Sequence, residues 1–129
     1  MDNLMISPIL GLLGMVMAFA IYMLVMRYPD GEDKVKKIGD QIHTGALTFM
    51  KTEYKYLTMF MAVIVLLAWY ALGPYTAIAV VVGALCSSIA GFIGMYAATK
   101  ANVRTATAAQ KDGSAAALTV SFYGGSIMG

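Results

Sequence analysis

A run of about twenty-five uncharged and mostly apolar residues extends from Tyr75 to Thr99 and ends abruptly at Lys100 and Arg104. A helix needs about twenty such residues to cross a hydrocarbon core roughly 30 Å thick. The run therefore predicts a transmembrane helix. Because a membrane span must pack against lipid or against other helices, this one segment sets the class of fold that the rest of the chain can adopt.

Small residues recur at every fourth position of this run, in two sets. They are Gly83, Ser87 and Gly91, and then Ala90, Gly94 and Ala98. In a helix each set forms a smooth stripe, along which a neighbouring backbone can approach closely. Two stripes predict packing against more than one partner helix, and we expect more partners than this short chain supplies.

Composition agrees with a membrane protein. The chain has 129 residues, of which 60% are hydrophobic and 12% charged, whereas soluble domains are near 45–50% apolar and about 25% charged. Cys86 is the only cysteine and lies within the apolar run. This excludes a disulfide framework and a thiolate metal cluster, and we interpret Cys86 as a small buried apolar residue.

Hydropathy predicts an all-α, multi-pass membrane protein with three complete spans and the start of a truncated fourth. The spans cover residues 5–26, 56–72 and 75–99, and the fourth begins at 115–129. The first run is too long for a signal-peptide core and lacks a basic residue before it. Gly73 and Pro74 predict a tight turn between the second and third spans. The fourth run is too short to cross a bilayer.

Two polar segments, 27–55 and 100–114, contain all nine lysine and arginine residues. Basic residues favour the cytoplasmic side, so both segments are predicted to be cytoplasmic. The N-terminus, which carries Asp2 and no basic residue, is predicted to be outside. The second segment, from Lys100 to Ser114, is predicted to be a polar loop.

Residues 32–55 predict an amphipathic helix that lies at the membrane surface and runs into the second span. Its predicted apolar face comprises Val35, Ile38, Ile42, Ala46 and Phe49. Such a helix can bind a partner or anionic lipid, or it can be a solvated connector packed on its own protein.

The best local candidates for metal-assisted chemistry are the acidic residues Asp30, Glu32 and Asp33, beside Lys34, Lys36 and Lys37. Metal-dependent phosphoryl chemistry needs several converging carboxylates, and no second acidic cluster faces this one. Acidic residues at a helix start also complement the helix dipole. We therefore assign no catalytic, cofactor-binding or metal-binding residue to this chain.

Three further polar residues have structural interpretations. His43 is read as a satisfied surface histidine, because no second ligand residue is patterned with it. Glu53 is read as an interfacial residue paired with Lys51 or Lys55. Arg104 is placed either to touch phosphate or the edge of a catalytic domain, or to anchor the third span. The apolar runs carry no charged side chain for an ion pathway, and the basic residues do not form a nucleic-acid-binding face.

Three stretches resemble the N-terminal portion of the membrane-bound, ion-translocating inorganic pyrophosphatases. They are IGDQIHTGALTFMKTEYKYL, GALCSSIAGFIGMYAATKANVRTATAA and AALTVSFYGGSIMG. The resemblance covers nearly the whole chain but at most the first quarter of a family member. A longer insertion that is usual in vacuolar members is missing, which favours a prokaryotic-type protein of the plasma membrane.

The resemblance implies a homodimer of sixteen-helix subunits that couples hydrolysis of Mg²⁺-pyrophosphate to export of protons, sodium ions or both. It implies Mg²⁺ as the cofactor of the whole pump and leaves K⁺ dependence open. The first four helices of the family belong to an outer ring, and a signature resembling DVGADLVGK, which begins the catalytic site, is absent from this sequence. The chain alone is therefore expected to bind no cofactor and to be inactive. A small accessory or structural membrane protein without enzymatic activity is the alternative.

Overall fold

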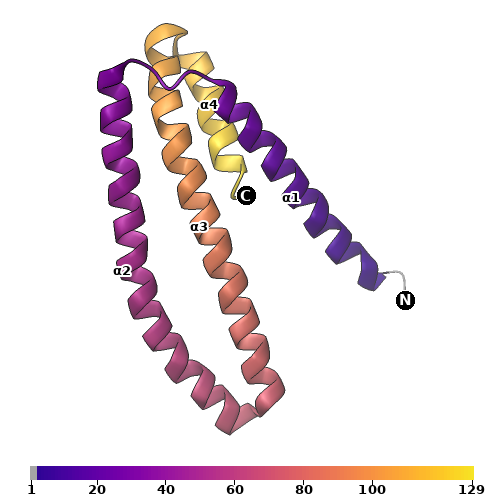
Figure 1. The fold of residues 1–129 in the computed structure, drawn as a ribbon. Helices are drawn as coiled ribbons and strands as arrows, with labels where there is room; N and C mark the ends of the chain where they lie inside the picture. The colour runs from indigo at the N-terminus through magenta and orange to yellow at the C-terminus, as the bar shows by residue number, and fades with distance from the viewer. Residues whose placement is uncertain (1–2) are drawn as a thin grey trace.

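Residues 3–129 are described by a computed structural model and form four α-helices (Figure 1). These are α1 (Asn3–Arg27), α2 (Asp33–Leu72), α3 (Pro74–Lys111) and α4 (Ser114–Ser126). Helices α2 and α3 form a long antiparallel hairpin, α4 folds back beside α3, and α1 diverges from the other helices toward its N-terminus. The described residues contain no strand, so the predicted all-α fold is confirmed. Asp2 lies outside the described residues.

Three of these helices, α1, α2 and α3, contain segments that are long and apolar enough to cross a membrane. This confirms the multi-pass class, with a shorter fourth helix. The predicted spans 5–26, 56–72 and 75–99 fall within α1, α2 and α3, and 115–129 covers most of α4 and the residues after it. The positions at which the chain enters and leaves the bilayer stay predictions.

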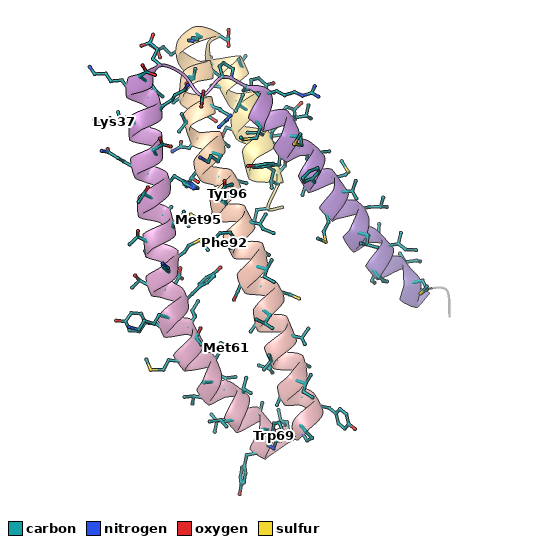
Figure 2. All side chains as sticks on the ribbon, viewed as in Figure 1. Lys37, Met61, Trp69, Phe92, Met95 and Tyr96 are labelled. Carbon is teal, nitrogen blue, oxygen red and sulfur yellow. The ribbon has the colours of Figure 1, made fainter. Side chains whose placement is uncertain are left out.

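A single glycine makes the turn between α2 and α3. Gly73 has a φ of 93° and its N–H donates to the Trp69 carbonyl at 3.2 Å. A side chain at this φ is strained, which explains glycine here, and Pro74 then begins α3 at a position where its missing N–H does no harm. Trp69 lies at this end of the hairpin and Lys37 near the other (Figure 2). The predicted turn is confirmed.

The segment after the third span differs from its prediction. Residues 100–111 are not a polar loop, because α3 continues as a helix to Lys111. The segment is polar but rich in alanine, and alanine, lysine, arginine and glutamine all favour helix. Its side chains also pack, since Ala101, Arg104 and Thr107 are buried. Polarity alone was therefore the wrong basis for predicting a loop.

The amphipathic segment before the second span is helical and runs into that span, as predicted, because α2 is one continuous helix of 40 residues that runs beside α3 (Figure 1). Its position at the membrane surface stays a prediction. No proline interrupts the helix at the junction. Of the predicted apolar face, Val35 and Ala46 are half-buried, whereas Ile38, Ile42 and Phe49 are 56%, 44% and 60% exposed. The buried residues of this segment are Gly39 and Met50, which the predicted face did not include.

The small-residue stripes of α3 do meet more than one helix, as predicted. A Cβ built on Gly91 would lie 3.1 Å from the Tyr54 hydroxyl on α2, and one built on Gly94 would lie 2.6 Å from the sulfur of Met128, just beyond α4. Gly83 has no neighbour within 4 Å of such a Cβ. The described residues therefore supply neighbours for Gly91 and Gly94 but not for Gly83, in line with the expectation that the stripes need more partners than this chain supplies.

A small apolar core lies where α1, α3 and α4 meet. Val25, Ala97, Ala101 and Ile127 are buried there, with Ala18, Ile21, Tyr22 and Tyr123 packed against them. Most other large apolar side chains are exposed, including most of those on α1. Because hydrocarbon replaces water around a membrane span, such exposure is the pattern expected of these helices.

Candidate functional site

The polar residues converge on the linker between α1 and α2, residues 28–32, where it crosses the far end of α3. Arg104 of α3 is only 7% exposed. Its Nε donates to the Tyr28 carbonyl at 3.1 Å, and its Nη1 donates to the Lys100 carbonyl at 2.9 Å. A buried guanidinium requires such partners because desolvation of an unpaired charge is costly. Arg104 thus anchors α3 to the linker, and we call these contacts the linker clamp.

Two glycines allow the linker and α2 to approach α3 closely. A Cβ on Gly31 would meet the Thr107 hydroxyl oxygen, and one on Gly39 would meet a methyl group of Val103. Gly31 also has a φ of 93°, a conformation that other residues rarely adopt. The sequence did not mark a close approach at either glycine, because that approach depends on which side chains α3 places opposite them.

The acidic residues in and beside the linker interact with neighbouring groups. Asp30 pairs with Lys36 at 3.4 Å, with both side chains about half exposed. Partial desolvation acts to raise the pKa of Asp30. A hydrogen bond from its own backbone N–H and the charges of Lys36 and Arg104 outweigh that effect, so the pKa lies below its ordinary value. Asp33 lies in the first turn of α2, where a negative charge complements the helix dipole.

These carboxylates do not fit a Mg²⁺ site. Hard divalent cations are held by several converging oxygens, and within the described residues no three His, Cys, Asp or Glu side chains are grouped in a way that could hold a metal. Asp30 is already paired with a cation. The linker therefore offers no set of ligands that could hold a metal ion for hydrolysis.

His43 bridges α2 and α3. Its Nδ1 lies 2.7 Å from the hydroxyl of Thr99, which donates to the Tyr96 carbonyl at 2.9 Å. The imidazole also meets the Tyr96 ring edge-on, with 5.0 Å between ring centroids, and Lys100 Nζ lies 6.0 Å from the centroid of the same ring. Tyr96 lies on α3 on the side of α2 (Figure 2). His43 is thus a satisfied histidine, half-buried between helices.

A second polar contact joins the same two helices further along. The Tyr54 hydroxyl donates to the Ser88 carbonyl at 2.6 Å, beside Gly91. Glu53, by contrast, is exposed and forms no ion pair with any described residue, so the predicted pairing with Lys51 or Lys55 is wrong. Residues two positions apart project from different sides of a helix and cannot pair.

A cleft of about 90 Å³ lies between these contacts. It is lined by Asp30, Lys36, Gly39, Asp40, His43, Thr99, Lys100, Val103 and Arg104. Ligand pockets for small organic molecules are several times larger, at about 300–1,000 Å³. Its charged lining is mixed in sign, and its most buried cation, Arg104, is committed to two carbonyls. The geometry of this cleft supports a role in holding the helices together rather than a role in catalysis.

Long apolar helices joined at one end by a polar clamp define a multi-pass α-helical membrane protein. Residues 12–129 match the family model of the inorganic H⁺ pyrophosphatases, and the chain belongs to this family. The match covers α1 from its middle onward and all of α2, α3 and α4. The family resemblance seen in the sequence is therefore confirmed.

Curated relatives include pumps for two different ions. The chain is 38% identical to the K⁺-stimulated pyrophosphate-energized sodium pump of Thermotoga maritima, with 87% of this chain and 16% of the relative covered. It is 34% identical to the K⁺-insensitive pyrophosphate-energized proton pump of Pyrobaculum aerophilum, with 97% and 18% covered. The K⁺-insensitive pyrophosphate-energized proton pump 2 of Moorella thermoacetica is also 34% identical, with 100% and 19% covered. The chain thus spans less than a fifth of the length of these relatives.

Proposed function

We propose that this chain forms the N-terminal, outer-ring helices of a pyrophosphate-energised pump that exports protons or sodium ions. The family match over residues 12–129 carries the proposal. It is supported by relatives that are named as pumps for H⁺ or Na⁺. The reaction of the whole pump would be hydrolysis of pyrophosphate coupled to ion movement, with Mg²⁺ as cofactor and K⁺ as an activator in the K⁺-stimulated type.

Within such a pump the part described here would support the fold rather than perform the reaction. Its polar contacts join α3 to the linker and α2 to α3, as in the bonds from Arg104 to Tyr28 and between His43 and Thr99. The apolar runs of the spans carry no ionisable carboxylate, which ion relays in membranes normally require. Catalytic groups and the ion pathway would come from other helices of the same pump, which would assemble as a homodimer.

The proposal is tested by expressing the pump-length protein encoded by the gene in inverted membrane vesicles. Addition of Mg²⁺-pyrophosphate is expected to release phosphate and to drive either acidification of the lumen or uptake of labelled sodium. Repeating the assay with and without K⁺ assigns the type. A pump-length protein that releases no phosphate under any of these conditions would contradict the proposal.

The inactivity of the 129-residue chain is tested separately. Membranes that contain only this chain are expected to hydrolyse Mg²⁺-pyrophosphate at the rate of membranes without it. A rate above that background, proportional to the amount of inserted chain, would show that catalytic groups lie within these residues.

A further inference from the structure

We propose that the cleft between the linker, α2 and α3 binds a single phosphate group, which adds to the contacts that hold these elements together. The inference goes beyond the proposed function, because it concerns this cleft and not the reaction of the pump. The ligand is defined by its chemistry, a tetrahedral oxyanion, which either inorganic phosphate or the head group of an anionic phospholipid supplies. The observation that points to a ligand is the environment of Arg104.

Arg104 is a buried cation without a counter-charge among residues 3–129. Its side chain is only 7% exposed, and no described carboxylate forms an ion pair with it. Two backbone carbonyls accept hydrogen bonds from its Nε and Nη1, but a carbonyl is neutral and does not balance the charge. Taking an ionised group out of water is costly unless an opposite charge is paired with it. An anion in the cleft would supply that charge.

One end of the Arg104 guanidinium is open to such an anion. A guanidinium carries five N–H donors, and the two carbonyls use only one on Nε and one on Nη1. Nη2 donates to none of the described residues, yet it is not enclosed, because no described side-chain nitrogen or oxygen is both buried and without a partner. Arg104 lines the cleft, so we place Nη2 at the cleft wall. The planar fork of arginine suits phosphate oxygens, which accept two parallel hydrogen bonds from it.

The other charges around the cleft leave a positive balance. Asp30 is paired with Lys36 at 3.4 Å, so these two side chains neutralise each other. Lys100 and Arg104 then face only Asp40, which is exposed and forms no ion pair with a described residue. The lining therefore favours an anion over a cation.

The size and the position of the cleft fit both sources of phosphate. Its volume of about 90 Å³ has room for several water molecules, and hence for one phosphate group. The apolar run of α3 ends at Thr99, which lines the cleft, so the cleft lies at the predicted level of the cytoplasmic lipid head groups. Basic pockets between membrane helices on this side are typical sites for anionic head groups. Inorganic phosphate reaches the same level from the cytoplasm.

Lysine acetylation in the pump-length protein tests the proposal at the cleft itself. The protein is placed in nanodiscs of phosphatidylcholine, and a water-soluble acetylating ester is added with or without inorganic phosphate at constant ionic strength. A bound phosphate shields the amine of Lys100 and keeps it protonated. We therefore expect acetylation of Lys100 to become roughly tenfold slower at a phosphate concentration of about ten times the dissociation constant. Lys111, an exposed lysine in the last turn of the same helix, is the control and should react at an unchanged rate.

Nanodiscs that contain phosphatidylglycerol and no inorganic phosphate form the second arm of the experiment. Protection of Lys100 in these nanodiscs assigns the site to a lipid head group, and protection by inorganic phosphate in phosphatidylcholine assigns it to the free ion. Acetylation of Lys100 at one rate in all of these conditions would overturn the proposal. Equal slowing of Lys100 and Lys111 would also overturn it, because general charge screening explains such a result.

Asp30→Asn distinguishes a phosphate site from a cleft with a purely structural role. The substitution removes a negative charge from the cleft lining and frees Lys36 from its ion pair. Phosphate or phosphatidylglycerol should therefore protect Lys100 at a roughly two- to fivefold lower concentration than in the unchanged protein. Asp33→Asn is the matched control, since Asp33 is exposed in the first turn of α2 and does not line the cleft. Protection of Lys100 that is unchanged or weaker in Asp30→Asn would contradict the assignment.

Discussion

Replacing Arg104 with methionine removes both hydrogen bonds that the guanidinium donates and keeps a side chain of similar length. The carbonyl of Tyr28 then loses its partner across the linker clamp. Leaving a buried polar group unpaired costs about 1–3 kcal/mol, so we expect a lower midpoint of thermal unfolding in detergent and faster proteolysis within residues 28–37.

The matched control for Arg104→Met is Asn102→Ala, an exposed residue of the same helix. It is expected to change neither the midpoint nor the proteolysis pattern. If Arg104→Met behaves like this control in both measurements, the linker is not held by the guanidinium.

The contact between His43 and Thr99 is tested by Thr99→Val, which replaces the hydroxyl with a methyl group of similar size. Because the hydroxyl joins two helices, we expect a loss of about 1 kcal/mol in the free energy of unfolding. Thr119→Val is the control, since Thr119 is exposed and bonds only to the Ala115 carbonyl of its own helix. Equal effects of the two substitutions in chemical denaturation would show that the bridge to His43 contributes nothing.

The ion pair of Asp30 predicts a small dependence of linker stability on pH. The pKa of Asp30 is lower in the folded protein than its ordinary value. Its contribution is therefore fully present above the unfolded-state pKa and is lost as the pH falls through the folded-state pKa. The partners are half exposed, so we expect only about 0.2–1 kcal/mol. Asp30→Asn should remove this contribution in proteolysis of the linker between pH 3 and 6; an unchanged pH profile would contradict it.

At the residue level the sequence could not reveal the partners of these groups. Arg104 and the carbonyl of Tyr28 are 76 positions apart, and His43 and Thr99 are 56 apart. No local pattern marks a backbone carbonyl as an acceptor for a distant guanidinium. The sequence did indicate a structural interpretation for each polar residue. The contacts agree with it for two of them, since Arg104 anchors α3 to the linker and His43 has a hydrogen-bond partner in Thr99.

The crossing of α2 and α3 depends on Gly39. A Cβ at this position would overlap a methyl group of Val103, and valine has little freedom to rotate away. Gly39→Ala is therefore expected to separate the helices and to destabilise the hairpin by about 1–3 kcal/mol in thermal unfolding. Adding Val103→Ala should recover part of the lost stability, because it removes the methyl group that the new Cβ would overlap.

Gly125→Ala is the comparison for Gly39→Ala. It also lies within a helix, but a Cβ there has no neighbour within 4 Å. Alanine is favoured over glycine by about 0.5–1 kcal/mol in a helix interior and by less in a last turn such as that of Gly125, so this variant should be neutral or slightly more stable. A Gly39→Ala variant that is likewise stabilised would show that α2 and α3 do not cross closely at this point.

Element boundaries were predictable where apolarity decides them and not where packing does. The runs that became α1, the second half of α2 and most of α3 are visible as hydropathy alone. The extension of α3 to Lys111 was missed because its polar residues suggested a loop, although alanine-rich segments favour helix. The predicted apolar face of α2 included Ile38 but not the buried Gly39, because hydropathy does not mark a glycine at which two helices approach closely.

At the scale of the whole molecule, the distribution of basic residues predicts that the hairpin turn is outside and the linker clamp is inside. With Cys86 replaced by serine, Tyr75→Cys near the turn should react with a membrane-impermeant maleimide in intact cells. Lys34→Cys in the first turn of α2 should react only after the cells are permeabilised. The reverse pattern would invert the topology.

The length of the α2–α3 hairpin has a mechanical consequence. With 40 and 38 residues, the two helices are about 57–60 Å long at 1.5 Å per residue, roughly twice the thickness of the hydrocarbon core. Because each is a single uninterrupted helix and the two are joined by contacts between them, a tilt of the hairpin about its Gly73 end would move both opposite tips together. A tilt of about 5° at that pivot displaces the opposite tips by about 5 Å. The linker clamp, which ties those tips to α1, would carry any such displacement across to the first helix.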